Sequence, residues 1–124
     1  MVANLNQFLR EVQEFSKSVP AQVVTLHKKI ALEALSRIVA KTPVDTGRAR
    51  GNWQTTINSS PSEELFLTDP VGNGAQALQI LGAYQAVIIA NNVPYIIFLE
   101  QGSSQQAPSG MVMLTVEELR GMFN

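Results

Sequence analysis

Few residues in this chain could carry catalytic chemistry. The single histidine, His27, lies in the middle of a long helical pattern. A Ser-His-Asp triad could in principle recruit Ser103 together with Asp45 or Asp69, but the sequence contains no nucleophile elbow and the spacing gives no support. We interpret His27 as a residue on the surface or boundary of a helix. A small hydrolase that uses His27 is the alternative from a different functional class.

Metal and cofactor sites are not expected either. The chain has no cysteine, so disulfides and thiolate ligands are excluded. Asp45 and Asp69 are isolated, and the pairs Glu63-Glu64 and Glu117-Glu118 resemble solvated starts of a strand and a helix. The sequence VGNGAQA, residues 71–77, lacks the Lys-Ser/Thr of a phosphate-binding loop. We therefore predict a glycine-rich turn there.

Two arginines spaced by one residue, Arg48 and Arg50, follow an Asp-Thr-Gly turn. On a β-strand they would point the same way and could hold a phosphate or a carboxylate. The same face carries no aromatic side chain, which is poor support for nucleic-acid recognition. Pairing with acidic residues of a neighbouring subunit is at least as consistent with this pattern.

The composition fits one domain, residues 1–124, with an unusual surface. Hydrophobic residues make up 45% of the chain and charged residues only 15%, which favours a surface partly covered by a partner. The net charge of −1 gives no general attraction to nucleic acid or anionic lipid. We find no signal-peptide pattern and no apolar run long enough to span a membrane. A soluble protein made inside the cell is expected.

The first half of the chain predicts two helices and a strand. Apolar residues recur at helical spacing over residues 4–17 and again over residues 20–41, where Pro43 should end the helix. From Arg48 the period changes to two. Trp53 would then face the core, while the alternating polar residues through Asn58 would form a solvated or partner-facing side.

The second half predicts shorter elements in the order turn, strand, loop, helix, strand, helix, strand, helix. We expect a turn at 59–62, a strand at 64–68, a loop at 69–74, a helix at 75–83, a buried strand at 85–90, a short helix at 95–101 and a strand at 111–114. Thr115 to Glu118 has the spacing of a capping box that would open a C-terminal helix. The whole indicates an α+β fold, with a long N-terminal helix packed on a small, mostly antiparallel sheet, short helices and a C-terminal helix.

The segment from Tyr95 to Leu99 is apolar on all sides. One helix face in a domain of this size cannot bury all five side chains. Either the segment is deep in the core or part of it faces another chain, and the low charge favours the second interpretation.

Two stretches together resemble a known family. TPVDTGRARGNW (residues 42–53) and NNVPYIIFLEQGSSQQAPSGMV (residues 91–112) are similar, in order and spacing, to tail-completion (neck) proteins of long-tailed bacteriophages and prophages. The resemblance covers about residues 28–119. The matching positions are Thr42, Pro43, Asp45, Thr46, Gly47, Arg48, Asn52, Trp53, Asn91, Asn92, Pro94, Tyr95, Leu99, Glu100, Gly102, Ser103, Gln106, Ala107, Pro108 and Gly110.

The resemblance implies a non-enzymatic α+β virion protein, without cofactors, that is made and assembled in the bacterial cytoplasm. It would form a ring, usually a homohexamer, that completes the tail and joins it to the head connector. Its other partners would be neck and tail proteins, namely the connector or stopper and the tail terminator or tail tube. Genome DNA would pass through the ring without sequence-specific recognition. A tail terminator or another connector ring is the close alternative.

A ring subunit presents two different surfaces to its neighbours. We expect the loop at 102–110 to reach a neighbour or the tail tube, and the two arginines to lie at a subunit contact or in the channel. The residues expected at the assembly interface are Arg48, Arg50, Tyr95, Phe98, Glu100, Ser103, Gln105 and Gln106.

Overall fold

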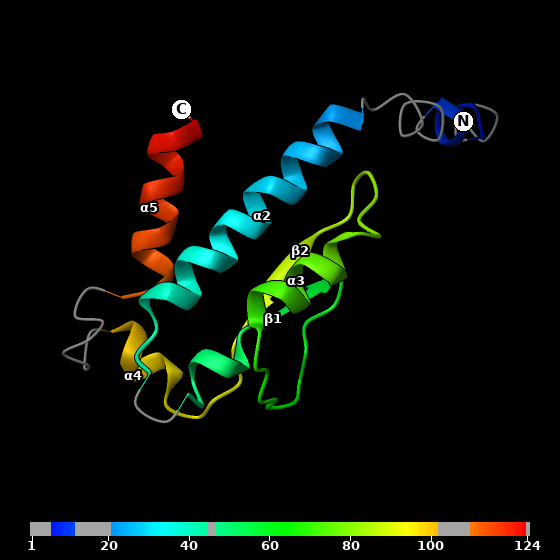
Figure 1. Ribbon diagram of the computed structural model, residues 1–124. Helices are drawn as coiled ribbons and strands as arrows, with labels where there is room; N and C mark the ends of the chain where they lie inside the picture. The colour runs from blue at the N-terminus through cyan, green and yellow to red at the C-terminus, as the bar shows by residue number, and fades with distance from the viewer. Residues whose placement is uncertain (1–5, 12–20, 45–46, 102–109, 124) are drawn as a thin grey trace.

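The long helix α2 spans Ala21–Lys41 and organises the domain (Figure 1). The computed structural model describes residues 6–11, 21–44, 47–101 and 110–123, of which residues 6–11 are helical. Helix α2 ends two residues before Pro43, as predicted, because a residue before proline is pushed out of the helical conformation. Its buried residues Ala31, Leu35 and Ile38 form one stripe at helical spacing.

The sheet has two antiparallel strands, β1 (Gln54–Ile57) and β2 (Val87–Ala90), paired from Gln54 opposite Ala90 to Ile57 opposite Val87. The prediction that the strand begins at Arg48 is wrong. Residues Arg50–Asn52 form a short 3₁₀ helix, η1. Gly47 has a φ of +73°, and a Cβ at Gly51 would lie 2.9 Å from the backbone oxygen of Leu67. This tight turn delays the strand.

Helix α3 spans Pro70–Leu78, so the loop predicted at 69–74 is wrong. The side chain of Asp69 caps the helix by accepting the N–H of Gly72, and Pro70 occupies the first turn, where its missing N–H costs nothing. Gly74 is buried against α2, since a Cβ there would lie 2.2 Å from Leu35 Cδ2. Gly74 therefore permits close helix packing, and this segment forms neither a phosphate loop nor the predicted turn.

The helix predicted at 75–83 is wrong at its end, because α3 stops at Leu78, and the strand predicted at 85–90 begins only at Val87. The remaining differences concern residues 64–68 and the start of the last helix. Residues 64–68 form no strand. The C-terminal helix α5, Val112–Phe123, begins where a strand was predicted, and Thr115 lies inside it, donating its hydroxyl to the carbonyl of Met111. The short helix α4, Ile96–Glu100, agrees with the prediction.

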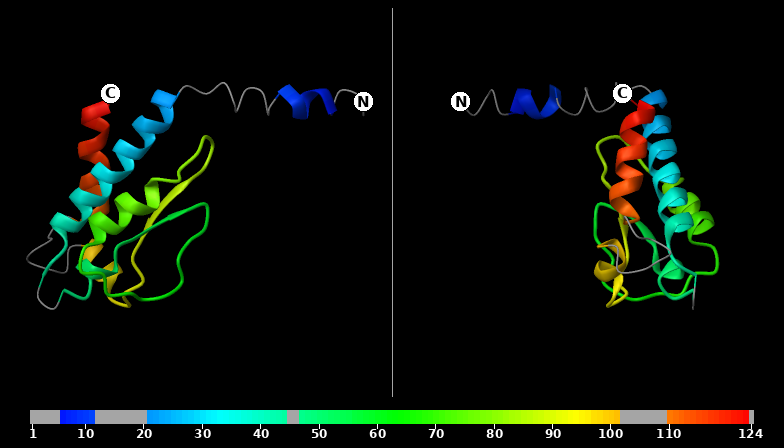
Figure 2. Two further views of the ribbon diagram at one scale, coloured as in Figure 1. Left: turned by 45° about the vertical axis from the view of Figure 1, so that its right-hand side comes forward. Right: turned by 90° about the vertical axis from the view of Figure 1, so that its left-hand side faces the viewer.

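Two groups of buried side chains hold these elements together. Leu35 and Ile38 of α2 pack with Trp53 and Met111, and Ala31, at the middle of α2, packs with Leu78 and Leu81. Helix α5 runs beside α2 in both views of Figure 2, and α3 packs on both α2 and β1. The fold is α+β, with the small antiparallel sheet and the C-terminal helix that the pattern predicted.

Candidate assembly surface

The two stretches that carry the family resemblance meet in the structure. Asn52 is fully buried, and its Oδ1 accepts the backbone N–H of Asn92 at 2.6 Å while its Nδ2 donates to the carbonyl of Leu65 at 2.7 Å. This pair continues the β1–β2 register by two residues beyond Gln54 and Ala90. At this position the side-chain oxygen of Asn52 accepts the N–H that a backbone carbonyl would accept if the ladder continued.

Asn91 and Asn92 also stabilise the contact between these two stretches. Asn91 Nδ2 donates to the carbonyl of Ala49 at 2.7 Å, and Asn92 Nδ2 donates to the carbonyls of Pro61 and Glu63 at 3.1 and 2.8 Å. The asparagine pair therefore ties three chain segments together. Gln54, only 6% exposed, also donates to the carbonyl of Glu63. The expectation that the polar side of this strand is solvated or partner-facing is wrong at these positions, because loop carbonyls satisfy the side chains internally.

Arg50 and Trp53 fix the end of α2. The guanidinium of Arg50 donates to the carbonyl of Thr42, at 2.7 Å from Nη2, and to that of Ala40 at 3.4 Å. Trp53 Nε1 donates to the hydroxyl of Thr42, which donates in turn to the carbonyl of Ile38. The last carbonyls of a helix lack partners within the helix and carry partial negative charge, so a cation is favourable there. This explains Arg50 without an external ligand.

Arg48 lies apart from Arg50, so the prediction that both point the same way on a strand is wrong. Arg48 is half-exposed and pairs with both carboxylate oxygens of Glu64, with Nη2 at 2.9 Å from Oε2, and its guanidinium lies 5.5 Å from the ring centre of Tyr95. The hydrogen bond to Glu64 raises the pKa of Arg48 and lowers the pKa of Glu64. Arg48 is the more exposed of the two arginines.

Glu100 serves as the N-terminal cap of α5. Its carboxylate accepts the backbone N–H groups of Met111, Val112 and Met113 at 2.9 to 3.0 Å. Gly110, with a φ of +90°, approaches so closely that a Cβ would lie 2.8 Å from the Glu100 carbonyl oxygen. A carboxylate suits this position because the free N–H groups attract negative charge. We expected Glu100 at an interface, and the structure uses it inside the subunit. No local motif signals a cap that comes from another helix.

Helix α4 divides its apolar side chains between the core and the surface. Ile96 and Leu99 pack against the core around Leu35 and Trp53, whereas Ile97 and Phe98 are 65% and 62% exposed. The α4–α5 junction adds further exposed apolar residues, and we call the whole the α4–α5 apolar surface: Ile97, Phe98, Val112, Met113 and Val116. The segment that sequence analysis found too apolar for one helix face therefore does expose part of itself.

The other predicted site residues divide into two groups. Pro43 is buried, Tyr95 is half-buried and Pro94 is exposed at the entry to α4. The following lie outside the described residues: Asp45, Thr46, Gly102, Ser103, Gln105, Gln106, Ala107 and Pro108. Of the predicted loop at 102–110, only Gly110 lies among the described residues, and it packs against Glu100 of the same subunit.

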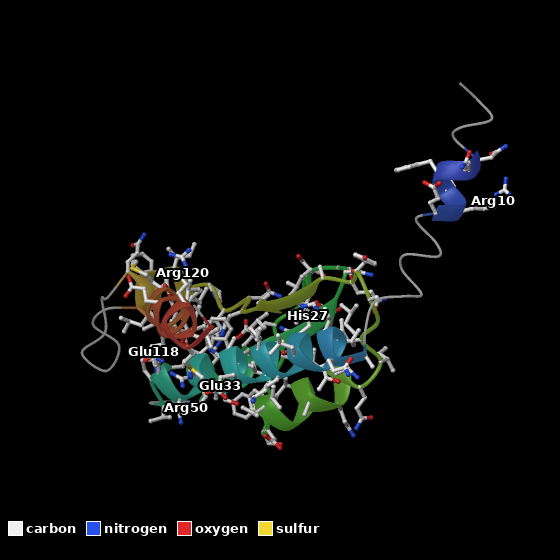
Figure 3. The ribbon with its side chains drawn as sticks, turned by 90° about the horizontal axis from the view of Figure 1, so that it is seen from above. Arg10, His27, Glu33, Arg50, Glu118 and Arg120 are labelled. Carbon is white, nitrogen blue, oxygen red and sulfur yellow. The ribbon has the colours of Figure 1, made fainter. Side chains whose placement is uncertain are left out.

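His27 lies on the N-terminal half of α2, away from the end where Arg50 and Glu118 are found (Figure 3). Asp69, the described acidic member of the hypothetical triad, caps α3. Within the described ranges, no group of three or more His, Cys, Asp or Glu residues could hold a metal ion. Among the same residues, no helix is both long and apolar enough to cross a membrane.

Comparison of this chain with protein-family models, with curated proteins and with solved structures finds no match.

Proposed function

We propose that this chain is a non-enzymatic structural protein of the neck of a long-tailed bacteriophage, where it forms a ring that completes the tail and joins it to the head. The resemblance of residues 42–53 and 91–112 to tail-completion proteins motivates the proposal. The hydrogen bonds between these two stretches support it, because they give the resembling residues a scaffolding role. In this proposal the head connector and the tail terminator or tail tube are the other partners.

The observation that carries the proposal is that α4 buries some of its apolar side chains and exposes others. Ile97 and Phe98 lie within one of the two resembling stretches, yet point away from the core. Val112, Met113 and Val116 are further exposed apolar side chains, and they lie in the first turns of α5, the helix that Glu100 of α4 caps. Large exposed apolar surfaces mark places where proteins bind other proteins. Exposed apolar side chains suit a permanent contact between ring subunits.

A ring requires a second, different surface on each subunit. Arg48, with Glu64 and Tyr95 beside it, provides a charged and aromatic surface near α4 but outside the apolar surface. In this proposal Arg48 contributes to a subunit contact through its exposed side, whereas Arg50 stays internal. Of the two arginines, we therefore assign only Arg48 to the assembly surface.

The experiment combines electron microscopy of the purified protein with complementation of a phage that lacks the gene. The double variant Ile97→Asp/Phe98→Asp should remain folded by circular dichroism, fail to form rings and leave heads and tails unjoined. Ile80→Asp is the matched control, because Ile80 is 82% exposed and lies in the turn after α3, outside both α4 and α5. Normal rings and infectious particles from the double variant would refute the proposal.

Substitution of His27 distinguishes the alternative class. A structural protein with His27→Ala should assemble and join tails normally. A hydrolase that depends on His27 should instead lose a measurable activity with the fold intact.

A further inference from the structure

Asn73 is the one asparagine of this chain that is followed by glycine. An Asn-Gly pair can modify itself without an enzyme. The backbone nitrogen of Gly74, after losing its proton, attacks the side-chain carbonyl carbon of Asn73 and closes a cyclic succinimide, while the side-chain nitrogen leaves as ammonia. Water then opens the ring at either carbonyl, which gives aspartate or isoaspartate. Glycine favours the attack because no Cβ hinders the approach of its backbone nitrogen.

The native fold keeps the two reacting atoms apart. Asn73 lies within α3, and helical side chains lean toward the N-terminal end of their helix. The Nδ2 of Asn73 accordingly donates to the carbonyl of Asp69, one turn back, at 2.9 Å. The nitrogen of Gly74 lies on the opposite, C-terminal side of the same residue. The attack therefore requires Asn73 to leave the helical conformation.

The packing of α3 on α2 requires the glycine that makes this pair reactive. Leu35 is fully buried, and a Cβ at Gly74 would lie 2.2 Å from its Cδ2. Glycine inside a helix lowers its stability, and α3 has only nine residues, a length at which an isolated helix does not persist in water. Helix α3 therefore depends on its tertiary packing and is an element that we expect to open locally.

We propose that Asn73–Gly74 is a site of spontaneous deamidation that α3 closes in the folded subunit and that local unfolding of α3 opens. Isoaspartate adds a methylene group to the backbone beside the contact of Gly74 with Leu35, so a chain with this product cannot restore that packing. Aspartate keeps the ordinary backbone and lies near the N-terminal end of α3, where negative charge is favourable. The inference rests on α3 alone and is independent of assembly into a phage neck.

Peptide mapping by mass spectrometry tests the site in the full chain, folded in buffer and unfolded in urea at the same pH and temperature. The unfolded chain should deamidate at Asn73 about 10- to 100-fold faster, because the folded chain reacts only through its opened fraction. Asn73→Gln is the control and should stay unmodified at this position, since its longer side chain must close a larger ring. Equal rates in the folded and unfolded chains, or no reaction at Asn73 in the unfolded chain, would overturn the proposal.

Two variants of the α3 cap test local opening in the folded protein. Asp69→Ala removes the oxygen that accepts the N–H of Gly72 at 3.0 Å and should raise the rate at Asn73 about fivefold. Asp69→Ser removes the charge but keeps a capping oxygen, so it should react nearly as slowly as wild type. Equal acceleration in both variants, or none in Asp69→Ala, would contradict control by α3. If Asp69→Ala does not fold, the comparison of folded with unfolded wild type still decides.

The two products should differ once urea is removed. Asn73→Asp, which reproduces the aspartate product, should refold with the circular dichroism spectrum of wild type. The isoaspartate fraction, separated by chromatography from the aged unfolded protein, should not regain the unfolding midpoint of wild type. Recovery of that midpoint by the isoaspartate chains would contradict the predicted loss of packing between Gly74 and Leu35.

Discussion

The buried Oδ1 of Asn52 accepts the backbone N–H of Asn92 at 2.6 Å, across 40 residues of sequence. Together with the bond from Asn91 to the carbonyl of Ala49, it joins the two stretches that resemble phage tail-completion proteins. It also explains why an asparagine occupies a position that the sequence pattern assigns to the solvated side of a strand. The amide accepts the N–H of Asn92, just after β2, on one side and donates to the carbonyl of Leu65 on the other.

Replacing Asn52 should therefore be costly. We expect Asn52→Leu to lower the free energy of unfolding by about 2–4 kcal/mol, because two buried backbone groups lose their partner. Asn58 is the matched control, since its Oδ1 accepts the N–H of Ala86 at 2.9 Å at the exposed end of the same ladder. Asn58→Gly, which keeps the positive φ of 68° accessible, should cost about 1 kcal/mol or less. Urea unfolding of both variants measures the difference, and equal losses would contradict the role given to Asn52.

The two arginines should behave differently. Arg50→Ala should lower the free energy of unfolding by about 1–2 kcal/mol, because the last carbonyls of α2 lose a charged donor. Arg48→Ala should leave the unfolding midpoint nearly unchanged, because an exposed ion pair contributes little. Thermal unfolding compares the two. If Arg48→Ala proves the more damaging substitution, the assignment of Arg50 to internal capping is wrong.

Glu100 should control the order of the first turn of α5. Removing its carboxylate in Glu100→Ala leaves three backbone N–H groups without their cap and should cost about 1–2 kcal/mol. Glu100→Gln should retain part of this stability, since an amide oxygen still accepts. Hydrogen exchange at Met111 to Met113 should accelerate most in Glu100→Ala. The exposed Glu117→Ala serves as the control on the same helix, and equal acceleration in that variant would argue against a specific cap.

Acid should weaken the attachment of α5 to α2. Lys41 Nζ lies 2.6 Å and Arg37 Nη1 lies 3.2 Å from Glu118 Oε1 (Figure 3 labels Glu118), and these hydrogen bonds, Lys41 first, lower the pKa of Glu118. A carboxylate with a lowered folded-state pKa contributes stability above its unfolded value, here ordinarily 4.5. That contribution is lost as the pH falls through the folded-state value.

The effect should be small, because the group is exposed and screened by salt. Unfolding midpoints recorded from neutral pH down to below pH 4.5 should fall less steeply in Glu118→Gln than in wild type. Identical pH profiles for the two proteins would remove Glu118 from this role.

Local patterns in the sequence determined a good part of this protein. Helical spacing and Pro43 defined α2, the apolar β-branched run defined β2, and Pro94 followed by apolar residues indicated α4. These elements are set by residues within a few positions of one another. The α+β fold class and the excess of apolar side chains on α4 could also be predicted from local sequence patterns.

The tertiary structure alone decided where several elements begin and what their polar residues do. Arg50, Asn52 and Gln54 alternate like the polar face of a solvated strand, yet their side chains donate to carbonyls within the subunit. Arg50 donates to the carbonyls of Ala40 in α2 and of Thr42 just after it, and the other two donate to carbonyls of the loop at 61–65. Likewise α5 starts where Glu100, on another helix, supplies its cap. Hydrogen bonds of this kind join groups far apart in the chain, so the local periodicity of the sequence cannot predict them. Which apolar residues of α4 face outward follows from the same long-range packing.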